Sequence, residues 1–196
     1  PASGYTVPLL LEYDYSSNAI TSDELKYREY VKDNYLNVAP KYKEYFLDLA
    51  EELEIKVDDS FSYIAKINDF FKDYKMLDLT TTEMKAFPED VDDIFYFMEE
   101  SKSGLSNHFA NATTLFYRSL GVPARYVEGY FSLPSEMGKP PIVVGGLFAH
   151  SWVEIYIDNV GWMMIDTSVV NAIPDELSEF LFGAPGVIIN DFEDRE

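Results

Sequence analysis

The fold of this chain is decided by residues 104–130, which read GLSNHFANATTLFYRSLGVPARYVEGY. We predict a helix from Ser106 to Leu120, because Gly121 and Pro123 come next and such residues end helices. A strand is predicted to follow over 124–133. The sequence therefore places a helix that begins at a serine directly before a strand.

Two further strands are predicted downstream. They cover residues 148–158 and 162–167, and a loop over 134–146 that is rich in Pro and Gly precedes them. A short turn around residues 158–161 joins the two strands. The second half of the chain therefore reads as one helix followed by an antiparallel sheet.

The length of that turn decides where Asp166 lies relative to His150. Side chains alternate between the faces of a strand, so His150 shares a face with Trp152. A turn of three residues, 158–160, places Asp166 opposite Trp152 and diagonal to His150, whereas a turn of five residues, 156–160, places it directly opposite His150. Either odd length puts both side chains on one face, and a two-residue turn would separate them.

The first half of the chain has the pattern of helices. Residues 5–15 read as an extended segment. Thr21 and Glu24 form a capping box that predicts a helix over 22–36. Pro40 suits the first turn of a second helix.

Two more helices are predicted before residue 104. Asp58 or Asp59 is expected to cap the third, and the fourth covers about 90–101. We expect the buried faces to be Tyr42, Tyr45, Phe46, Leu49 and Leu53 in the second helix, Phe61, Ile64, Ile67 and Phe71 in the third, and Val91, Ile94, Phe95 and Met98 in the fourth. Helices first and strands later predict an α+β domain.

Composition excludes several functions. The chain has 196 residues, 47% of them apolar, and a formal net charge of −20. Such an acidic surface repels nucleic acid and anionic lipid. The chain has no cysteine, which removes disulfides, thiolate metal sites and thiol nucleophiles. No apolar run approaches the roughly 18 residues that span a bilayer. Because the chain begins at Pro1, we expect a processed chain or a piece of a larger protein.

Three residues have the types that acyl-transfer chemistry needs. A nucleophile gains from a helix N-terminus, and Ser106 stands at the predicted helix start. A His must take its proton, and a third group must orient that His. Of the two histidines, His108 is tied to the first turn of its own helix, so His150 is the candidate base and Asp166 the candidate orienting group. The competing interpretation of Ser106 is a simple helix N-cap.

These segments resemble the transglutaminase-like superfamily. Residues 104–130 are similar to its pattern Gly-x-Cys-x-x-Phe-Ala, a helix, and Arg-x-x-Gly-Ile-Pro-Ala-Arg-Tyr-Val-x-Gly-Tyr. Residues 149–168, AHSWVEIYIDNVGWMMIDTS, resemble its His-Ala-Trp-Val-Glu-Val-Tyr, Gly-Trp and Asp-Pro-Thr. The resemblance is specific over about 104–167 and weaker over 35–103. The matching positions are Gly104, Ser106, Phe109, Ala110, Arg118, Gly121, Val122, Pro123, Ala124, Arg125, Tyr126, Val127, Gly129, Tyr130, His150, Trp152, Glu154, Gly161, Trp162 and Asp166.

The resemblance implies a catalytic site of Ser106, His150 and Asp166, with the family's nucleophilic cysteine replaced by Ser106. A lesser departure is Thr167-Ser168 in place of the family's Pro-Thr. A hydroxyl is far less acidic than a thiol, so the thiolate that the family's chemistry uses cannot form at this position. The implied fold is α+β, with a papain-like cysteine-protease core, N-terminal helices and an antiparallel sheet. We expect one domain over 1–196: a mainly helical part over 1–103, the catalytic-type core over 104–167, and a C-terminal extension over 168–196.

Several functions are compatible with these residues. The first is a domain impaired in acyl transfer or amide hydrolysis that binds peptide or protein, with Ser106 either natural or an engineered Cys→Ser change. The second is a non-catalytic surface interaction module, which a loop 134–146 closed over the site would favour. The third is a working serine hydrolase. The resemblance implies no cofactor and no metal. The acidic charge argues against nucleic acid as a partner, and the lack of a long apolar run argues against membrane insertion by this segment. The resemblance also implies an extracellular or cell-surface location within a larger bacterial protein.

Overall fold

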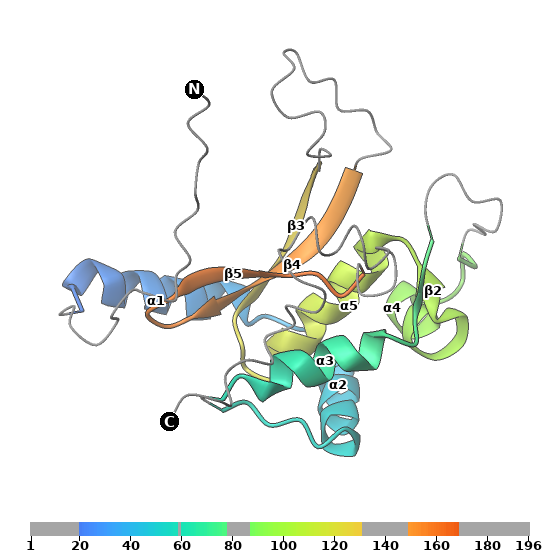
Figure 1. Ribbon diagram of the computed structural model, residues 1–196, viewed down its shortest axis with the longest axis horizontal. Helices are drawn as coiled ribbons and strands as arrows, with labels where there is room; N and C mark the ends of the chain where they lie inside the picture. Colours follow the sequence, from blue (N-terminus) through green and yellow to red (C-terminus); the bar gives the residue numbers. More distant parts are fainter. Residues whose placement is uncertain (1–19, 59, 78–86, 131–148, 169–196) are drawn as a thin grey trace, which may run out of the picture.

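The computed structural model describes residues 20–58, 60–77, 87–130 and 149–168 (Figure 1). Helices precede a three-stranded antiparallel sheet in the described part of the chain, which confirms the α+β architecture. The segments expected at 5–15, 134–146 and 169–196 lie outside the described residues. Among the residues described, no helix is long and apolar enough to cross a lipid bilayer.

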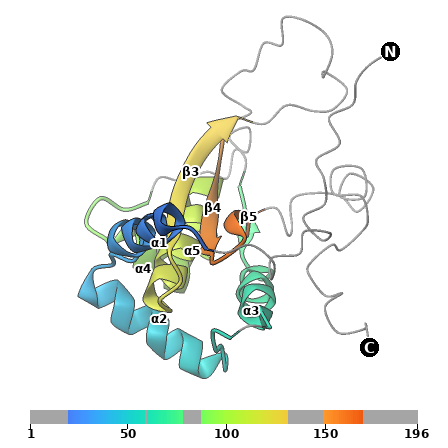
Figure 2. The ribbon, with the colours of Figure 1, turned by 90° about the vertical axis from the view of Figure 1, so that its left-hand side faces the viewer.

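The sheet and the helix α5 form the centre of the molecule. The strand order is β3 (Ala124–Tyr130), β4 (Ala149–Ile157) and β5 (Gly161–Ile165), and α5 (Ser106–Ser119) packs against β3 and β4 (Figure 2). The predicted helix end is confirmed, because α5 stops at its C-cap Leu120 and Gly121 adopts a φ of 81°. Glycine reaches this left-handed conformation without the steric penalty of a Cβ atom. The chain can therefore turn directly from α5 into β3.

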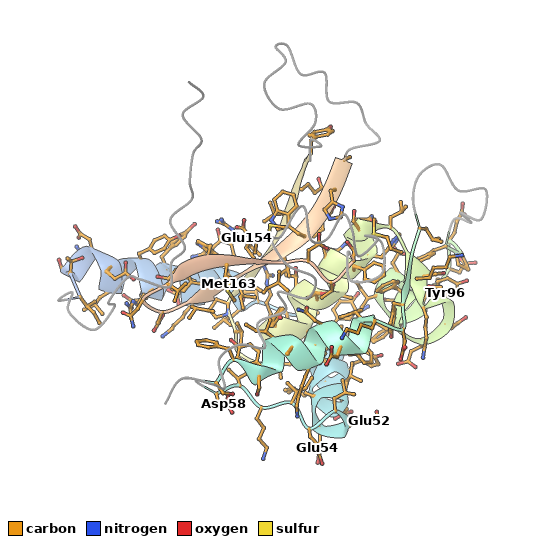
Figure 3. All side chains as sticks on the ribbon, viewed as in Figure 1. Glu52, Glu54, Asp58, Tyr96, Glu154 and Met163 are labelled. Carbon is orange, nitrogen blue, oxygen red and sulfur yellow. The ribbon has the colours of Figure 1, made fainter. Side chains whose placement is uncertain are left out.

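The first two helices also agree with the sequence prediction. Helix α1 (Ser22–Tyr35) is capped by Thr21, whose hydroxyl accepts a hydrogen bond from the Glu24 amide at 3.1 Å. Helix α2 (Pro40–Glu52) begins at Pro40. It packs on α5, and the rings of Phe46 and Phe116 stack with centroids 5.1 Å apart. Acidic side chains at the end of α2 and beyond it, such as Glu52, Glu54 and Asp58, point outward (Figure 3).

Helix α1 holds the turn between β4 and β5. Arg28 donates a hydrogen bond to the Asn159 side chain at 2.9 Å and pairs with Asp158 at 3.3 Å. On the same helix, Glu24 accepts a hydrogen bond from the Tyr156 hydroxyl at 3.0 Å. The Tyr27 hydroxyl accepts another from the Trp162 indole at 2.8 Å. These contacts attach the N-terminal helix to the sheet edge at its turn.

The start of the third helix differs from the prediction. Helix α3 (Ser62–Phe71) begins three residues later than a cap at Asp58 would require, or two later than a cap at Asp59 would. Its N-cap is Phe61, in a left-handed conformation with φ 56°. The Asp58 carboxylate instead accepts from the Ser60 amide at 3.0 Å, which closes a local turn before the helix. Asp59 itself lies outside the described residues.

The fourth helix differs in its geometry. A short α4 (Asp93–Phe95), capped by Asp92, continues as a π-helix (Tyr96–Ser101). The i→i+5 hydrogen bonds of a π-helix widen the turn, so a spacing of 3.6 residues no longer predicts the buried face. Met98 is buried as expected, but Phe97 is buried beside it and Val91, which precedes the helix, is 38% exposed.

A short parallel pair of strands, which the sequence did not suggest, precedes α5. Strand β1 (Lys75–Met76) pairs with β2 (Ser103–Gly104). The Lys75 amide donates to the Lys102 carbonyl at 2.8 Å, and the Leu77 amide donates to the Gly104 carbonyl at 2.8 Å. The chain immediately before Ser106 is therefore fixed by backbone hydrogen bonds.

Replacing Phe116 with Ala should destabilise the fold strongly, because its fully buried ring joins α5 to α2. We expect a loss of about 3–5 kcal/mol in the free energy of unfolding, measured by urea denaturation. The matched control is Leu47→Ala on α2, where the side chain is 42% exposed and should matter little. Equal losses for the two variants would contradict this packing.

Candidate functional site

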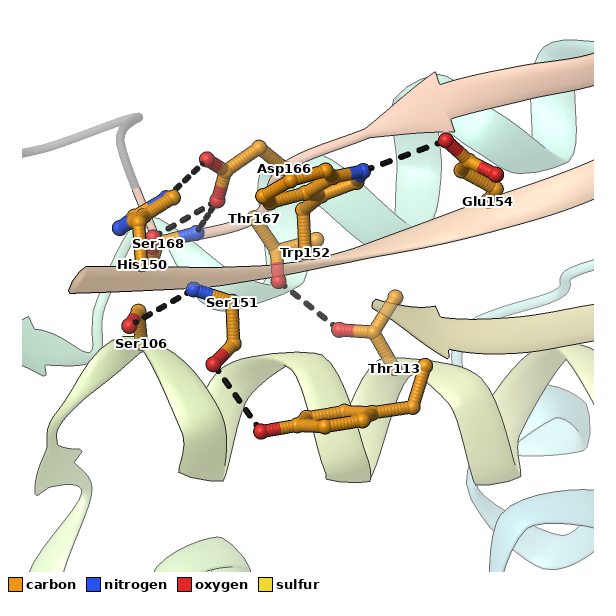
Figure 4. Close-up of polar contacts among 10 residues, drawn as sticks. Ser106, Thr113, His150, Ser151, Trp152, Glu154, Asp166, Thr167 and Ser168 are labelled. Carbon is orange, nitrogen blue, oxygen red and sulfur yellow. Dashed lines mark hydrogen bonds and ion pairs between the residues drawn. The ribbon is translucent and has the colours of Figure 1, made fainter. Parts of the chain in front are cut away.

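The β4–β5 hairpin brings His150 and Asp166 together. Ile157 pairs with Gly161, so the turn has three residues and Asp166 lies diagonal to His150. The shorter of the two predicted odd-length turns is therefore the one that forms. His150 Nε2 lies 2.5 Å from Asp166 Oδ2 (Figure 4). Their side chains are only 11% and 8% exposed, respectively, so this contact is largely shielded from water.

Asp166 is also held from its other side. The Ser168 amide donates to Asp166 Oδ1 at 3.0 Å, and the Ser168 hydroxyl donates to the same oxygen at 2.7 Å. One carboxylate oxygen thus faces His150 while the other is fixed by Ser168. In the sequence alone, Ser168 is only part of a departure from the family pattern. A carboxylate followed two residues later by a serine is the signature of an Asx turn and could have indicated this contact.

Ser106 occupies the first turn of α5 and is not its N-cap. The N-cap is Leu105, so the interpretation of Ser106 as a simple capping residue is wrong. Ser106 is 8% exposed, and its Oγ accepts a hydrogen bond from the Ser151 amide at 3.1 Å. Ser151 directly follows His150, and Figure 4 shows Ser106 below the end of β4 that carries His150. The fold therefore gathers all three predicted site residues at one end of β4.

A second layer of hydroxyl groups lies below the site, where one contact joins β3 to β4 and another joins α5 to the chain after β5. Ser151 Oγ and the Tyr126 hydroxyl lie 3.0 Å apart, and the Tyr126 hydroxyl also donates to Glu128. Burial, reinforced by the Glu128 carboxylate, raises the pKa of Tyr126. Farther along α5, the hydroxyls of Thr113 and Thr167 lie 2.8 Å apart. These contacts, which sequence reasoning missed, fix the residues on either side of the His–Asp pair.

Trp152 lies beside His150 on the outer face of the sheet. The two rings are nearly parallel, with centroids 6.5 Å apart. A Cβ added to Gly129 would lie 2.7 Å from the Trp152 ring, so a glycine is needed for the indole to lie against β3. The indole nitrogen donates weakly to Glu154 at 3.4 Å, and Arg125 donates to the other Glu154 oxygen at 2.7 Å. Trp152 is thus packed and anchored at the site.

His108 is bound to its own helix, as the sequence predicts. Its Nδ1 accepts a hydrogen bond from the Leu105 amide at 2.9 Å, which requires that nitrogen to be unprotonated. Burial lowers the pKa of His108, although Asp93 opposes the shift. His108 is therefore occupied by a structural contact and does not compete with His150 as a base. Within the described residues, no group of three or more His, Asp or Glu side chains is arranged to hold a metal ion.

Comparison with known proteins agrees with this architecture. The chain matches the model of the transglutaminase-like superfamily over residues 47–167, and it belongs to that superfamily.

Two curated proteins are similar in sequence. The uncharacterized protein YebA of Bacillus subtilis is 29% identical over 141 residues, which cover 68% of this chain and 19% of YebA. A protein-glutamine gamma-glutamyltransferase of Pseudomonas aeruginosa is 33% identical over 78 residues, which cover 40% of this chain and 11% of that protein. The chain therefore spans less than a fifth of the length of either relative.

A solved structure shares the fold. The periplasmic domain of TgpA from Pseudomonas aeruginosa bound to ethylmercury aligns with a TM-score of 0.59 and 23% identity, covering 74% of this chain and 50% of that one. A second structure of the same periplasmic domain gives a TM-score of 0.58 and 22% identity, covering 80% of this chain and 52% of that one. At these identities the likeness shows the fold alone.

The stability of the chain should depend on pH through His108. Because the folded pKa lies below the ordinary value of 6.5, the unfolded chain binds this proton more readily. The contribution of His108 to the free energy of unfolding is complete above pH 6.5. It decreases as the pH falls from there toward the lower pKa of the folded state. We expect urea denaturation to show a larger loss between pH 7.5 and 5 for the natural chain than for His108→Asn, which keeps an acceptor but does not titrate. The same loss in both would contradict the assignment.

Proposed function

We propose that this chain is a natural transglutaminase-like pseudoenzyme. Ser106 stands where the family has its nucleophilic cysteine, so the site does not perform thiol-dependent acyl transfer or amide hydrolysis, and it binds a peptide or protein segment instead. The observation that carries the proposal is the contrast between two halves of the site. His150 and Asp166 are paired at 2.5 Å and supported by Ser168, whereas the position at the start of α5 holds a hydroxyl.

The chemistry at position 106 supports the loss of catalysis. A cysteine thiol has an unperturbed pKa of about 8.5 and becomes a thiolate beside a basic His and a helix N-terminus. A serine hydroxyl is far less acidic, so it forms no comparable ion pair with His150. Serine acts as a nucleophile only when a base takes its proton during the attack and donors stabilise the oxyanion. The Ser106 oxygen is instead an acceptor for the Ser151 amide.

The ligand class follows from the site and from its relatives. The first amides of a helix have no partner within the helix, and those at the start of α5 can donate to a carbonyl group. Trp152 offers an aromatic surface beside His150. The similar protein from Pseudomonas aeruginosa is named for action on protein glutamine. A peptide segment that presents a carboxamide to Ser106 and His150 therefore fits the proposal.

The proposal includes the setting of the domain. The chain spans only 19% and 11% of its two curated relatives, and the structural neighbour is a periplasmic domain. We place this chain as an exported or cell-surface domain of a larger bacterial protein. Residues 1–196 would form one domain, with the core over 104–167 carrying the binding site. Its acidic composition would disfavour nucleic acid as a partner.

The decisive experiment replaces Ser106 with Cys and measures the rate of alkylation by iodoacetamide against pH. The introduced thiol would be the only one in the chain. We expect it to react rapidly well below the free-thiol pKa of about 8.5, and we expect His150→Ala to abolish this reactivity. The matched control is Ser119→Cys at the other end of the same helix, where the macrodipole disfavours a thiolate.

Two outcomes would refute the proposal of a site that has lost only its nucleophile. An ordinary or buried-type thiol titration at position 106 would show that the activating groups are lost too. Labelling of Ser106 in the natural chain by a fluorophosphonate would show a working serine hydrolase. We expect no such labelling in the folded protein.

Ligand binding should be detectable in the natural chain by NMR. Unstructured glutamine-containing peptides should shift the amide signals of Ser106, His150 and Ser151. Ser106→Phe should block binding by filling the site, whereas Asn111→Phe, at an exposed position on the same helix, should not. Equal binding by both variants would place the ligand elsewhere, with the acidic outer surface as the next candidate.

A further inference from the structure

The start of α5 lacks the usual side-chain cap. Serine, threonine, aspartate and asparagine are the preferred N-cap residues because their side chains accept hydrogen bonds from the first free amides. Here the N-cap is Leu105, whose side chain has no acceptor. The capping hydrogen bond at this end has the reverse direction: the backbone amide of Leu105 donates to the side-chain nitrogen Nδ1 of His108 at 2.9 Å. The peptide unit directly before Ser106 therefore depends on the imidazole.

The imidazole is itself fixed by aromatic rings. The ring of His108 lies against Phe87, with centroids 4.4 Å apart, and against Phe97, with centroids 5.9 Å apart. Phe97 is fully buried in the core. A ring packed against two aromatic side chains has little freedom to rotate, so its Nδ1 offers a fixed acceptor to Leu105.

The strand β2, which precedes Ser106, also lies against the ring of His108. A Cβ added to Gly104 would lie 2.8 Å from His108 Nδ1, and real Cβ atoms essentially never approach so closely. Gly104 belongs to β2, whose backbone is paired with β1. The backbone at Gly104 is thus paired with β1 and lies against the fixed imidazole of His108. This leaves no space for another side chain at Gly104.

We propose that His108 is the positioning residue for the group at position 106. By holding the Leu105 amide, it sets the direction in which the chain enters α5. That direction places the Ser106 side chain at the Ser151 amide and at the end of β4 that carries His150. His108 does not touch the ligand and transfers no proton; it acts through Leu105. The effect of His108 on chemistry at position 106 rests on the proposed function, but the placement of that side chain by His108 does not.

The first test uses amide hydrogen exchange in the natural Ser106 chain. His108→Phe preserves the aromatic packing and removes the acceptor, whereas His108→Asn places an oxygen near the position of Nδ1. We expect the Leu105 amide to lose its protection in the Phe variant and to keep it in the Asn variant. Gly104→Ala, which displaces the ring without removing it, should resemble His108→Phe. Equal protection of Leu105 in all these chains would overturn the proposal.

The second test measures the consequence at position 106. In the Ser106→Cys background, His108→Phe should lower the alkylation rate roughly tenfold or more, because a small displacement of a nucleophile costs much of its reactivity. Its pH profile should shift toward that of an ordinary thiol, and His108→Asn should restore most of the rate. An unchanged rate and pH profile in a reactive thiol would overturn the proposal.

The two tests separate this inference from the proposed function. If the thiol at position 106 is ordinary even with His108 present, the proposed function fails, and the exchange of the Leu105 amide still decides the role of His108. Circular dichroism and urea denaturation of each variant establish that the fold is retained. A general loss of structure would change many amides, whereas the proposed effect is confined to the start of α5.

Discussion

The site depends on the register between β4 and β5. A turn of three residues fixes the pairing of Ile157 with Gly161, and the contact between Asp166 and His150 follows from it. A slip by one residue would move Asp166 to the opposite face of the sheet, away from His150. The register is secured from both faces of the hairpin. Buried Val153, Ile155 and Ile165 lie toward the core, and the aromatic contacts with α1 lie on the outer side.

The nucleophile position depends on a different set of interactions. The backbone of β2, the cap from His108 and the packing of α5 on the sheet each fix one part of the segment around Ser106. Of these interactions only the cap from His108 is local in sequence, whereas His150 and Asp166 are brought together by a single hairpin. A hydrogen bond from the Ser151 amide to the Ser106 hydroxyl oxygen joins Ser106 to β4. A cysteine in place of Ser106 would therefore change the chemistry at this position without disturbing the elements that surround it.

The sequence allowed the α+β fold and the order of its main elements to be predicted, because caps, turns and strand alternation are local signals. As expected, Thr21 caps the start of α1, α2 begins at Pro40, and α5 ends before Gly121. Hairpin geometry offered two odd-length turns that place Asp166 on the face of His150 and a two-residue turn that separates them, and the structure has the three-residue turn. The buried face of the fourth helix was predicted only in part: Met98 is buried as expected, Val91 lies before the helix, and Phe97 was missed because the π-helix changes the number of residues per turn. The contacts of Ser168, Thr167 and Tyr126 were missed because they depend on how distant hydroxyls meet after folding.

The attachment of α1 to the hairpin has a consequence for where this domain begins. The matched family region starts at residue 47, yet Arg28 and Glu24 hold the β4–β5 turn from outside that region. Residues 22–35 therefore brace the hairpin from outside the region that matches the family model. A chain trimmed to residues 47–167 would keep Ser106, His150 and Asp166 but would release the turn that aligns the last two. The functional boundary of the domain thus lies upstream of its family boundary.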